Sequence, residues 1–245
     1  PRRTAPPEPE KPSEFSPPAH DISPKRVMAY LIKTRGIDPE IVKAMIQQKM
    51  IAEDSVHHNC LFFGRDENGV IRSCALRGST DVKFRGEAPG GDKSCTFAMV
   101  GHNDVLRLFE SPIDAMSHST FTKLLGKDWT ADHRLSVNGS GNYESIKRYL
   151  ANHTEIKSVW FCYDSDQAGR DGAEASSSRI FEDFPDRELS VMFCSPVKNK
   201  DWNEALQLFR VLESHGVTVR EFLAPTEFRS IPPPDCEQDE FECEL

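Results

Sequence analysis

Short apolar runs alternate with longer amphipathic stretches between residues 101 and 213, and this alternation constrains the fold most strongly. The runs are rich in β-branched and aromatic residues and lie at 105–109, 135–137, 159–163 and 189–194. Stretches of helical length lie at 112–125, 143–152, 168–184 and 202–212. Strands that alternate with helices predict a parallel sheet covered by helices on both faces. We therefore expect an α/β domain with four parallel strands over residues 101–213.

Residues 21–100 have a different pattern and are expected to form a small α+β domain. Ser23-Pro24 and Asp38-Pro39 each combine a helix-capping side chain with a proline suited to the first turn. They predict two helices, with Gly36 between them as a stop signal. Asn68-Gly69 lies between two apolar runs and predicts a β-hairpin.

The two ends of the chain have compositions typical of segments without a packed core. Residues 1–20 contain seven prolines and indicate an extended linker. Residues 214–245 contain eight Asp or Glu against two Lys or Arg, and a like-charge block of this kind predicts a solvated acidic tail.

Charge and cysteine content narrow the class of protein. The net charge is −9, but residues 21–100 carry 12 basic against 10 acidic side chains, so charge alone does not exclude a nucleic-acid partner. No apolar run approaches the roughly 20 residues that span a bilayer, so no membrane partner is expected. The seven cysteines form no C-x-x-C pair, which favours a reduced, cytoplasmic setting. His57-His58 beside Cys60 lacks a second ligand pair, and a zinc site is not expected there.

Three carboxylates follow the ends of two expected strands. Glu110 ends the first run, and Asp164 and Asp166 follow the third. In parallel sheets, functional groups gather at the carboxyl ends of the strands, and Mg²⁺ prefers oxygen ligands of this kind. The alternative is structural, since an Asp-Ser-Asp before a helix is often only an N-cap. Gly169 would allow the chain to turn tightly into that helix, whose amino terminus favours anions.

The motifs around these acids resemble the Toprim family of primases, topoisomerases and nucleases. The segment from Leu108 to Ala115 is similar to the Glu-Gly-x-x-Asp-Ala stretch of primases, with Ser111 in place of the glycine. The segment 161–169 resembles the family's Asp-x-Asp-x-Ala-Gly stretch, and 199–206 its Lys-Asp-x-Asn-Glu-x-Leu stretch. Upstream, Tyr30 to Ile37 and the expected hairpin at 62–77 look like the domain that precedes Toprim in primase-like proteins of mobile elements.

The resemblance implies a fold, a chemistry and a set of site residues. It implies a Rossmann-like four-stranded parallel sheet and Mg²⁺- or Mn²⁺-dependent phosphoryl transfer on DNA or RNA, with single-stranded nucleic acid as partner and other replication or mobilisation proteins as further partners. Glu110, Asp164 and Asp166 would be the catalytic and metal-binding residues. Asp114, Lys200 and Asp201 are candidates for supporting roles or phosphate contact. The zinc-binding domain of primases has no counterpart among these residues.

Residues 21–100 are expected to guide the nucleic acid, because backbone phosphates supply most sequence-independent affinity. The candidate phosphate contacts are Arg65, Arg72, Arg77, Lys83, Arg85 and Lys93. Three alternatives stay open: a Toprim nuclease, a receiver- or phosphatase-like domain with a phosphorylated Asp, and a non-catalytic module that binds nucleic acid or protein. A receiver would need adjacent acids after its first strand, where this chain has only Glu110.

Overall fold

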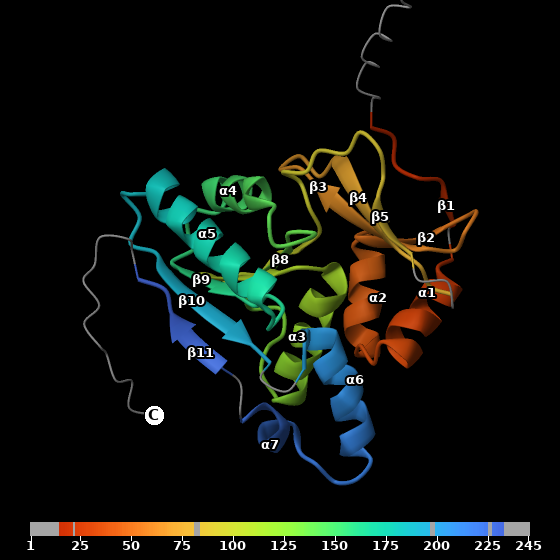
Figure 1. Ribbon diagram of the computed structural model, residues 1–245. Coiled ribbons are helices and arrows are strands. Elements are labelled where there is room, and N and C mark those ends of the chain that lie inside the picture. Colours follow the sequence, from red (N-terminus) through yellow and green to blue (C-terminus); the bar gives the residue numbers. More distant parts are fainter. Residues whose placement is uncertain (1–14, 22, 81–83, 197–198, 225–226, 233–245) are drawn as a thin grey trace, which may run out of the picture.

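The protein folds around two β-sheets (Figure 1). The computed structural model describes residues 15–21, 23–80, 84–196, 199–224 and 227–232. The first sheet is antiparallel throughout, in the order β1-β2-β3-β4-β5. Its strands are β1 (His20–Asp21), β2 (Ile51–Asp54), β3 (Cys60–Arg65), β4 (Ile71–Arg77) and β5 (Arg85–Glu87).

Local signals account for the elements of this α+β domain. Helix α1 (Lys25–Ala29) continues into the π-helical turn η1 (Tyr30–Thr34), and α2 (Pro39–Gln47) follows. Gly36 reverses the chain between them with a φ of 73°, a conformation that glycine adopts freely. The Asp38 side chain accepts a hydrogen bond of 2.8 Å from the Glu40 amide and caps α2. The hairpin expected at Asn68-Gly69 joins β3 to β4.

The second sheet contains the four expected parallel strands and two antiparallel edge strands, in the order β11-β10-β9-β7-β8-β6. The parallel strands are β7 (Val105–Phe109), β8 (His133–Ser136), β9 (Ser158–Phe161) and β10 (Ser190–Ser195). The edge strands are β6 (Ala98–Met99) and β11 (Glu227–Ser230). The segment assigned to an acidic tail therefore begins with structure, since residues 214–231 include helix α7 (Val219–Leu223) and β11. Residues 1–14 and 233–245 lie outside the described part.

Helices cover both faces of the second sheet, as expected for a doubly wound α/β domain (Figure 1). On one face lie α3 (Pro112–Leu124) and α6 (Trp202–Glu213), and on the other α4 (Tyr143–Asn152) and α5 (Gln167–Asp183). The side chains of β7 alternate between the two faces of the sheet and pack against the helices on each face. Leu106 and Leu108 pack under α4 and α5, and Phe109 packs under α3.

One apolar cluster joins the two domains. It contains Val27, Leu31 and Ile41 from the first domain together with Met116 and Leu206 from α3 and α6 of the second, all fully or almost fully buried. Helix α2 lies directly beside α3 (Figure 1). The two sheets are therefore held in a fixed relation by a common core.

Asn203 makes the main polar junction inside this interface. Its amide nitrogen Nδ2 donates to the Arg35 carbonyl (3.0 Å) and to the Ser117 hydroxyl (2.9 Å), and its Oδ1 accepts from the Arg35 guanidinium (3.0 Å). Its backbone N–H donates to the buried Asp114 carboxyl at 3.0 Å. The Arg-Gly turn of the first domain and the start of α6 are thus joined by one side chain, which is 4% exposed.

The described residues contain no helix with the length and apolar character needed to cross a bilayer. The five cysteines in this part of the chain are buried and form no disulfide.

Replacing Asn203 with Ala should lower the free energy of unfolding by more than about 2 kcal/mol, because each buried polar group left without a partner costs about 1–3 kcal/mol. Urea denaturation measures this quantity. Gln207→Ala on the same helix removes one exposed hydrogen bond to the Thr34 carbonyl (2.9 Å) and is the matched control, with a change of no more than about 1 kcal/mol. Equal effects of the two substitutions would contradict the assigned role of Asn203.

Candidate metal centre and adjoining cleft

Glu110 and Asp164 meet at the carboxyl edge of the parallel sheet, as expected. Glu110 directly follows β7, Asp164 lies just beyond β9, and these two strands are neighbours. The backbone N–H of Asp164 donates to Glu110 Oε1 at 3.2 Å, which orients the Glu110 carboxylate toward the end of β9.

The two carboxylate oxygens of Asp166 have different partners. Its Oδ1 accepts from the Gly169 amide at 3.0 Å and caps α5. Its Oδ2 lies 3.1 Å from the Lys200 ammonium, which is also 3.5 Å from Asp164 Oδ2. The two aspartates therefore direct an oxygen each toward one cation.

Close packing fixes the backbone around this pair. A Cβ atom at Gly169 would overlap the Asp164 carbonyl oxygen, so only glycine fits where α5 begins. Ser165 anchors the segment that carries Lys200, because its amide donates to the Lys200 carbonyl at 2.7 Å and its hydroxyl to the Asn199 carbonyl at 2.9 Å.

The raised pKa values of Asp164 and Glu110 indicate a site with too little positive charge to balance its carboxylates. Burial raises the pKa of Asp164 to about 7, and the negative charges of Glu110 and Asp201 add to this shift. Burial also raises the pKa of Glu110, against the smaller opposing effects of Arg85 and Lys200. The pKa of Asp166 is lowered by the Gly169 amide and by Lys200. A carboxylate set with raised pKa values favours an additional cation.

The donor set suits Mg²⁺, which binds through one or two carboxylates together with waters and phosphates. Among the described residues, however, Glu110, Asp164 and Asp166 do not each bring an oxygen to within 4.8 Å of the others. Lys200, within 3.5 Å of both aspartates, is the cation that now offsets their charge.

The supporting acids have defined structural partners. Asp114 is 7% exposed and accepts from the Asn203 amide and the Ser111 hydroxyl, and burial raises its pKa to about 7. Asp201 caps α6 by accepting from the Glu204 amide at 2.7 Å. Both acids contribute negative charge near Asp164 while serving the fold.

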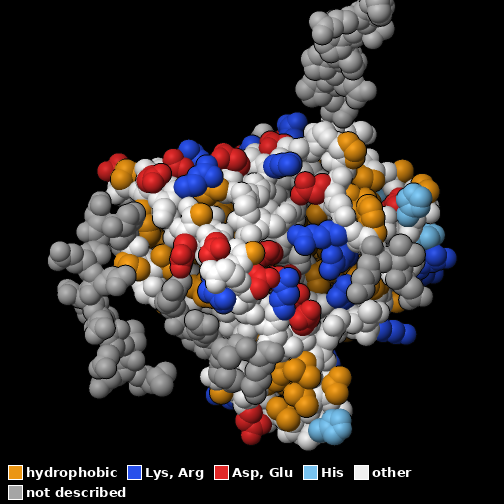
Figure 2. Space-filling model, in the orientation of Figure 1, with side chains coloured by type: hydrophobic (Ala, Val, Ile, Leu, Met, Phe, Trp, Pro, Cys, Tyr) orange, Lys and Arg blue, Asp and Glu red, His pale blue; other side chains and the backbone are white. Residues whose placement is uncertain are grey.

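A cleft of about 680 Å³ separates the first sheet from the carboxyl edge of the second and reaches Glu110. Arg77, Arg85 and Lys93 line its wall on the first domain. Figure 2 shows Lys and Arg side chains next to Asp and Glu side chains near the middle of the face of the molecule that it draws. The cleft thus places basic groups opposite an acidic edge.

The remaining candidate phosphate contacts lie elsewhere. Arg65 donates to the Gly69 and Lys49 carbonyls at 2.6 and 2.7 Å and stabilises the hairpin. Arg72 pairs with Asp66 at 2.7 Å. Neither side chain lines the cleft, because the hairpin uses both of them. Lys83 lies outside the described residues.

The loop 138–142 forms the opposite wall of the cleft and was not among the residues expected at the site. Asn138 and Gly139 adopt φ values of 56° and 114°, and the Gly139 amide donates to the Glu110 carbonyl at 3.0 Å. Asn142 reaches across to the Lys93 carbonyl at 2.9 Å. The signal in the sequence was Asn-Gly-Ser-Gly-Asn directly after an expected strand.

Two family models match the chain in succession. A model described as a protein of unknown function (DUF3991) matches residues 29–103, and a model described as Toprim-like matches residues 107–206. An uncharacterized protein of Bacillus anthracis is 30% identical over 158 residues. The match covers 59% of this chain and 44% of that protein, so this chain spans less than half of its relative's length.

Solved structures with a similar fold come from primases. The primase fragment of the bacteriophage T7 primase-helicase matches with a TM-score of 0.53 at 18% identity, over 75% of this chain and 71% of that one. A bacteriophage T7 lagging-strand DNA polymerase structure with primase domains bound to an RNA/DNA hybrid and dTTP matches with a TM-score of 0.50 at 18% identity. That match covers 78% of this chain and 88% of the other. The chain therefore contains a region that matches the DUF3991 model, followed by a region that matches the Toprim-like model, and its fold is similar to that of the T7 primase fragment.

Proposed function

We propose that this protein carries out Mg²⁺-dependent phosphoryl transfer on single-stranded DNA or RNA held in the cleft between its two domains. The observation that carries the proposal is that the Lys200 ammonium contacts both Asp164 and Asp166, while the Asp164 amide holds the Glu110 carboxylate next to them. Two carboxylates that already direct oxygens at one cation are arranged to hold a divalent ion. The cleft that reaches Glu110 supplies a basic wall for the phosphates of the strand.

Each residue has a separate role in this proposal. Asp164 and Asp166 would hold Mg²⁺, with Glu110 beside them. When bound, the ion neutralises charge on the reacting phosphoryl group. Burial raises the pKa of Glu110, which favours a role in exchanging a proton with the attacking or leaving oxygen. Lys200 would move from the aspartates to a phosphate oxygen.

The residues on the walls of the cleft support binding of nucleic acid there. Arg77, Arg85 and Lys93 face the loop 138–142, whose small residues allow a backbone to approach closely. The similar T7 primase structure was solved with an RNA/DNA hybrid, which supports the same class of partner for this chain. Contacts to phosphates carry no base preference, so binding should be largely indifferent to sequence.

The metal site can be tested with Mn²⁺ as the probe. The double substitution Asp164→Asn with Asp166→Asn should weaken Mn²⁺ binding by more than about 100-fold, since loss of a residue that only supports a metal ligand already costs about 10–100-fold. Isothermal titration calorimetry measures the affinity. Asp171→Asn, on the exposed face of α5, is the control and should bind as the wild type does. Equal affinity of the wild type and the double variant would remove the site.

The activity that the ion supports is tested on the same proteins. Primer synthesis and cleavage of single-stranded oligonucleotides should be assayed with Mg²⁺ and Mn²⁺, and either activity should disappear in the double variant. A chain that binds metal and nucleic acid but turns over neither substrate would be a binding module.

The cleft can be tested through salt dependence. Arg77→Ala with Arg85→Ala should weaken binding of a single-stranded oligonucleotide and reduce the slope of log affinity against log salt by up to about 1.4, because each phosphate contact on a single strand contributes about 0.7. Fluorescence anisotropy gives both quantities. Arg72→Ala is the control, since Arg72 pairs with Asp66 outside the cleft. If neither DNA nor RNA binds at low salt with Mg²⁺ present, a protein-partner role becomes the better hypothesis.

A further inference from the structure

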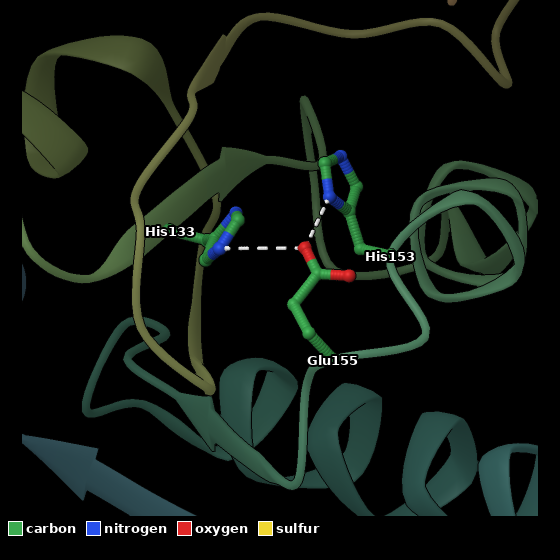
Figure 3. Close-up of side chains that lie close together, drawn as sticks. All are labelled: His133, His153 and Glu155. Carbon is green, nitrogen blue, oxygen red and sulfur yellow. Dashed lines mark hydrogen bonds and ion pairs between the residues drawn. The ribbon is translucent and has the colours of Figure 1, made fainter.

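A second group of metal-ligating side chains lies at the opposite, amino-terminal edge of the parallel sheet. His133 begins β8, His153 follows the end of α4, and Glu155 lies in the loop before β9. Figure 3 shows the three side chains directed toward one another. Glu155 Oε1 lies 2.8 Å from His153 Nδ1 and 3.8 Å from His133 Nε2, and the three atoms are within 4.8 Å of one another.

Packing holds the two imidazole rings in this arrangement. The His133 side chain is 2% exposed, and its Nδ1 lies 2.9 Å from the Tyr149 hydroxyl. The Tyr149 ring stacks on His153 with a centroid distance of 4.2 Å and an interplanar angle of 25°. Both rings are therefore ordered before any ligand binds, which reduces the entropy lost on binding.

We propose that His133 Nε2, His153 Nδ1 and the Glu155 carboxylate form a binding site for a transition-metal ion, with Zn²⁺ as the ion of best fit. Two imidazoles and one carboxylate are a donor set typical of zinc. Tetrahedral bonds of about 2.0–2.1 Å place ligand atoms roughly 3.3 Å apart. Glu155 Oε1 lies 2.8 and 3.8 Å from the two imidazole nitrogens, on either side of that value, and these nitrogens lie within 4.8 Å of each other, so an ion would draw the two rings together.

Three protein ligands leave one coordination position open, as in zinc sites that bind water or a further ligand. The Glu155 side chain is 53% exposed, so solvent reaches this position, and His153 and Tyr149 also line a cleft of about 440 Å³ between α4 and the first domain. The site is independent of the carboxylates at the other edge, and neither proposal depends on the other.

Binding requires one proton to change place on His133. Its Nε2 now lies 3.1 Å from the Asn103 carbonyl, to which it donates when Nδ1 accepts from Tyr149. A metal needs the lone pair of Nε2, which points along the direction that the Asn103 carbonyl now occupies, so this carbonyl must also move aside. The proton then sits on Nδ1 and is donated to the Tyr149 hydroxyl, which turns from donor to acceptor. Metal-bound histidines usually have such a partner on the second ring nitrogen.

The described part of the chain contains one other three-residue group of possible ligands, formed by Asp21, Glu53 and His58. In this group the carboxylate of Glu53 already has structural partners. Glu53 Oε2 accepts from the amides of Arg26 and Val27 at 3.0 and 3.3 Å, and its Oε1 pairs with His58. Its carboxylate is used to begin α1, so this group carries no proposal.

Titration of the full chain with Zn²⁺ tests the site. The wild type and the Asp164→Asn/Asp166→Asn variant should each bind one Zn²⁺ at this edge. His153→Ala and Glu155→Gln should weaken that binding by more than about 100-fold, by the same comparison with supporting residues. His102→Ala is the matched control, since His102 is an exposed histidine near Asp128 and outside the cluster. Glu155→Gln keeps a hydrogen-bond acceptor for His153, so it remains informative if His153→Ala does not fold.

A second readout reports on His133 itself. Nitrogen NMR of the imidazole should show the proton on Nδ1 after Zn²⁺ is added, and Co²⁺ in place of Zn²⁺ should give the intense visible absorption of a tetrahedral site. Zn²⁺ binding that is unchanged in both His153→Ala and Glu155→Gln, or that is lost only in the Asp164→Asn/Asp166→Asn variant, would overturn the proposal. Absence of Zn²⁺ binding to the wild type would do the same.

Discussion

The apolar cluster shared by α1, α2, α3 and α6 is the constraint on which the rest of the structure depends. A fully buried aliphatic or aromatic side chain contributes about 1.5–3 kcal/mol, and this cluster draws such side chains from both domains. Because the two sheets cannot separate without exposing it, the walls of the cleft keep their spacing. The basic wall and the acidic edge are thus held opposite each other by packing that extends to the floor of the cleft at Phe62 and Ile113, and Asn203 fixes the register of that packing.

The spacing of apolar residues and the helix-start signals in the sequence were sufficient to predict the parallel core. β-branched and aromatic runs gave the four strands, and Asp38-Pro39 marked where α2 begins. Ser23-Pro24 lies at the start of α1, but no side chain caps that helix. The two strand ends with acids could be placed on one edge because parallel strands share their direction. Edge strands β6 and β11 were missed, since two to four residues with mixed composition have no period of their own.

The sequence could not predict which side chains form hydrogen bonds and ion pairs with one another. Nothing in the local pattern distinguishes Arg72, which is held by Asp66, from Arg77, which lines the cleft. The meeting of His133 with His153 and Glu155 depends on how the end of α4 packs against the start of β8, and spacing along the chain does not encode it. The same holds for Asp114, whose proximity to Asn203 joins positions 89 residues apart.

The double use of Asp166 has a consequence for how such domains diverge. One oxygen begins α5 and the other faces Lys200, so the two duties can be separated by a single exchange. Serine or asparagine at this position would still cap the helix but would remove the negative charge. A lineage could therefore lose the proposed metal site in one step and retain a folded protein. Homologues with intact architecture and a neutral residue at this position would be the expected descendants, free to be recruited as scaffolds.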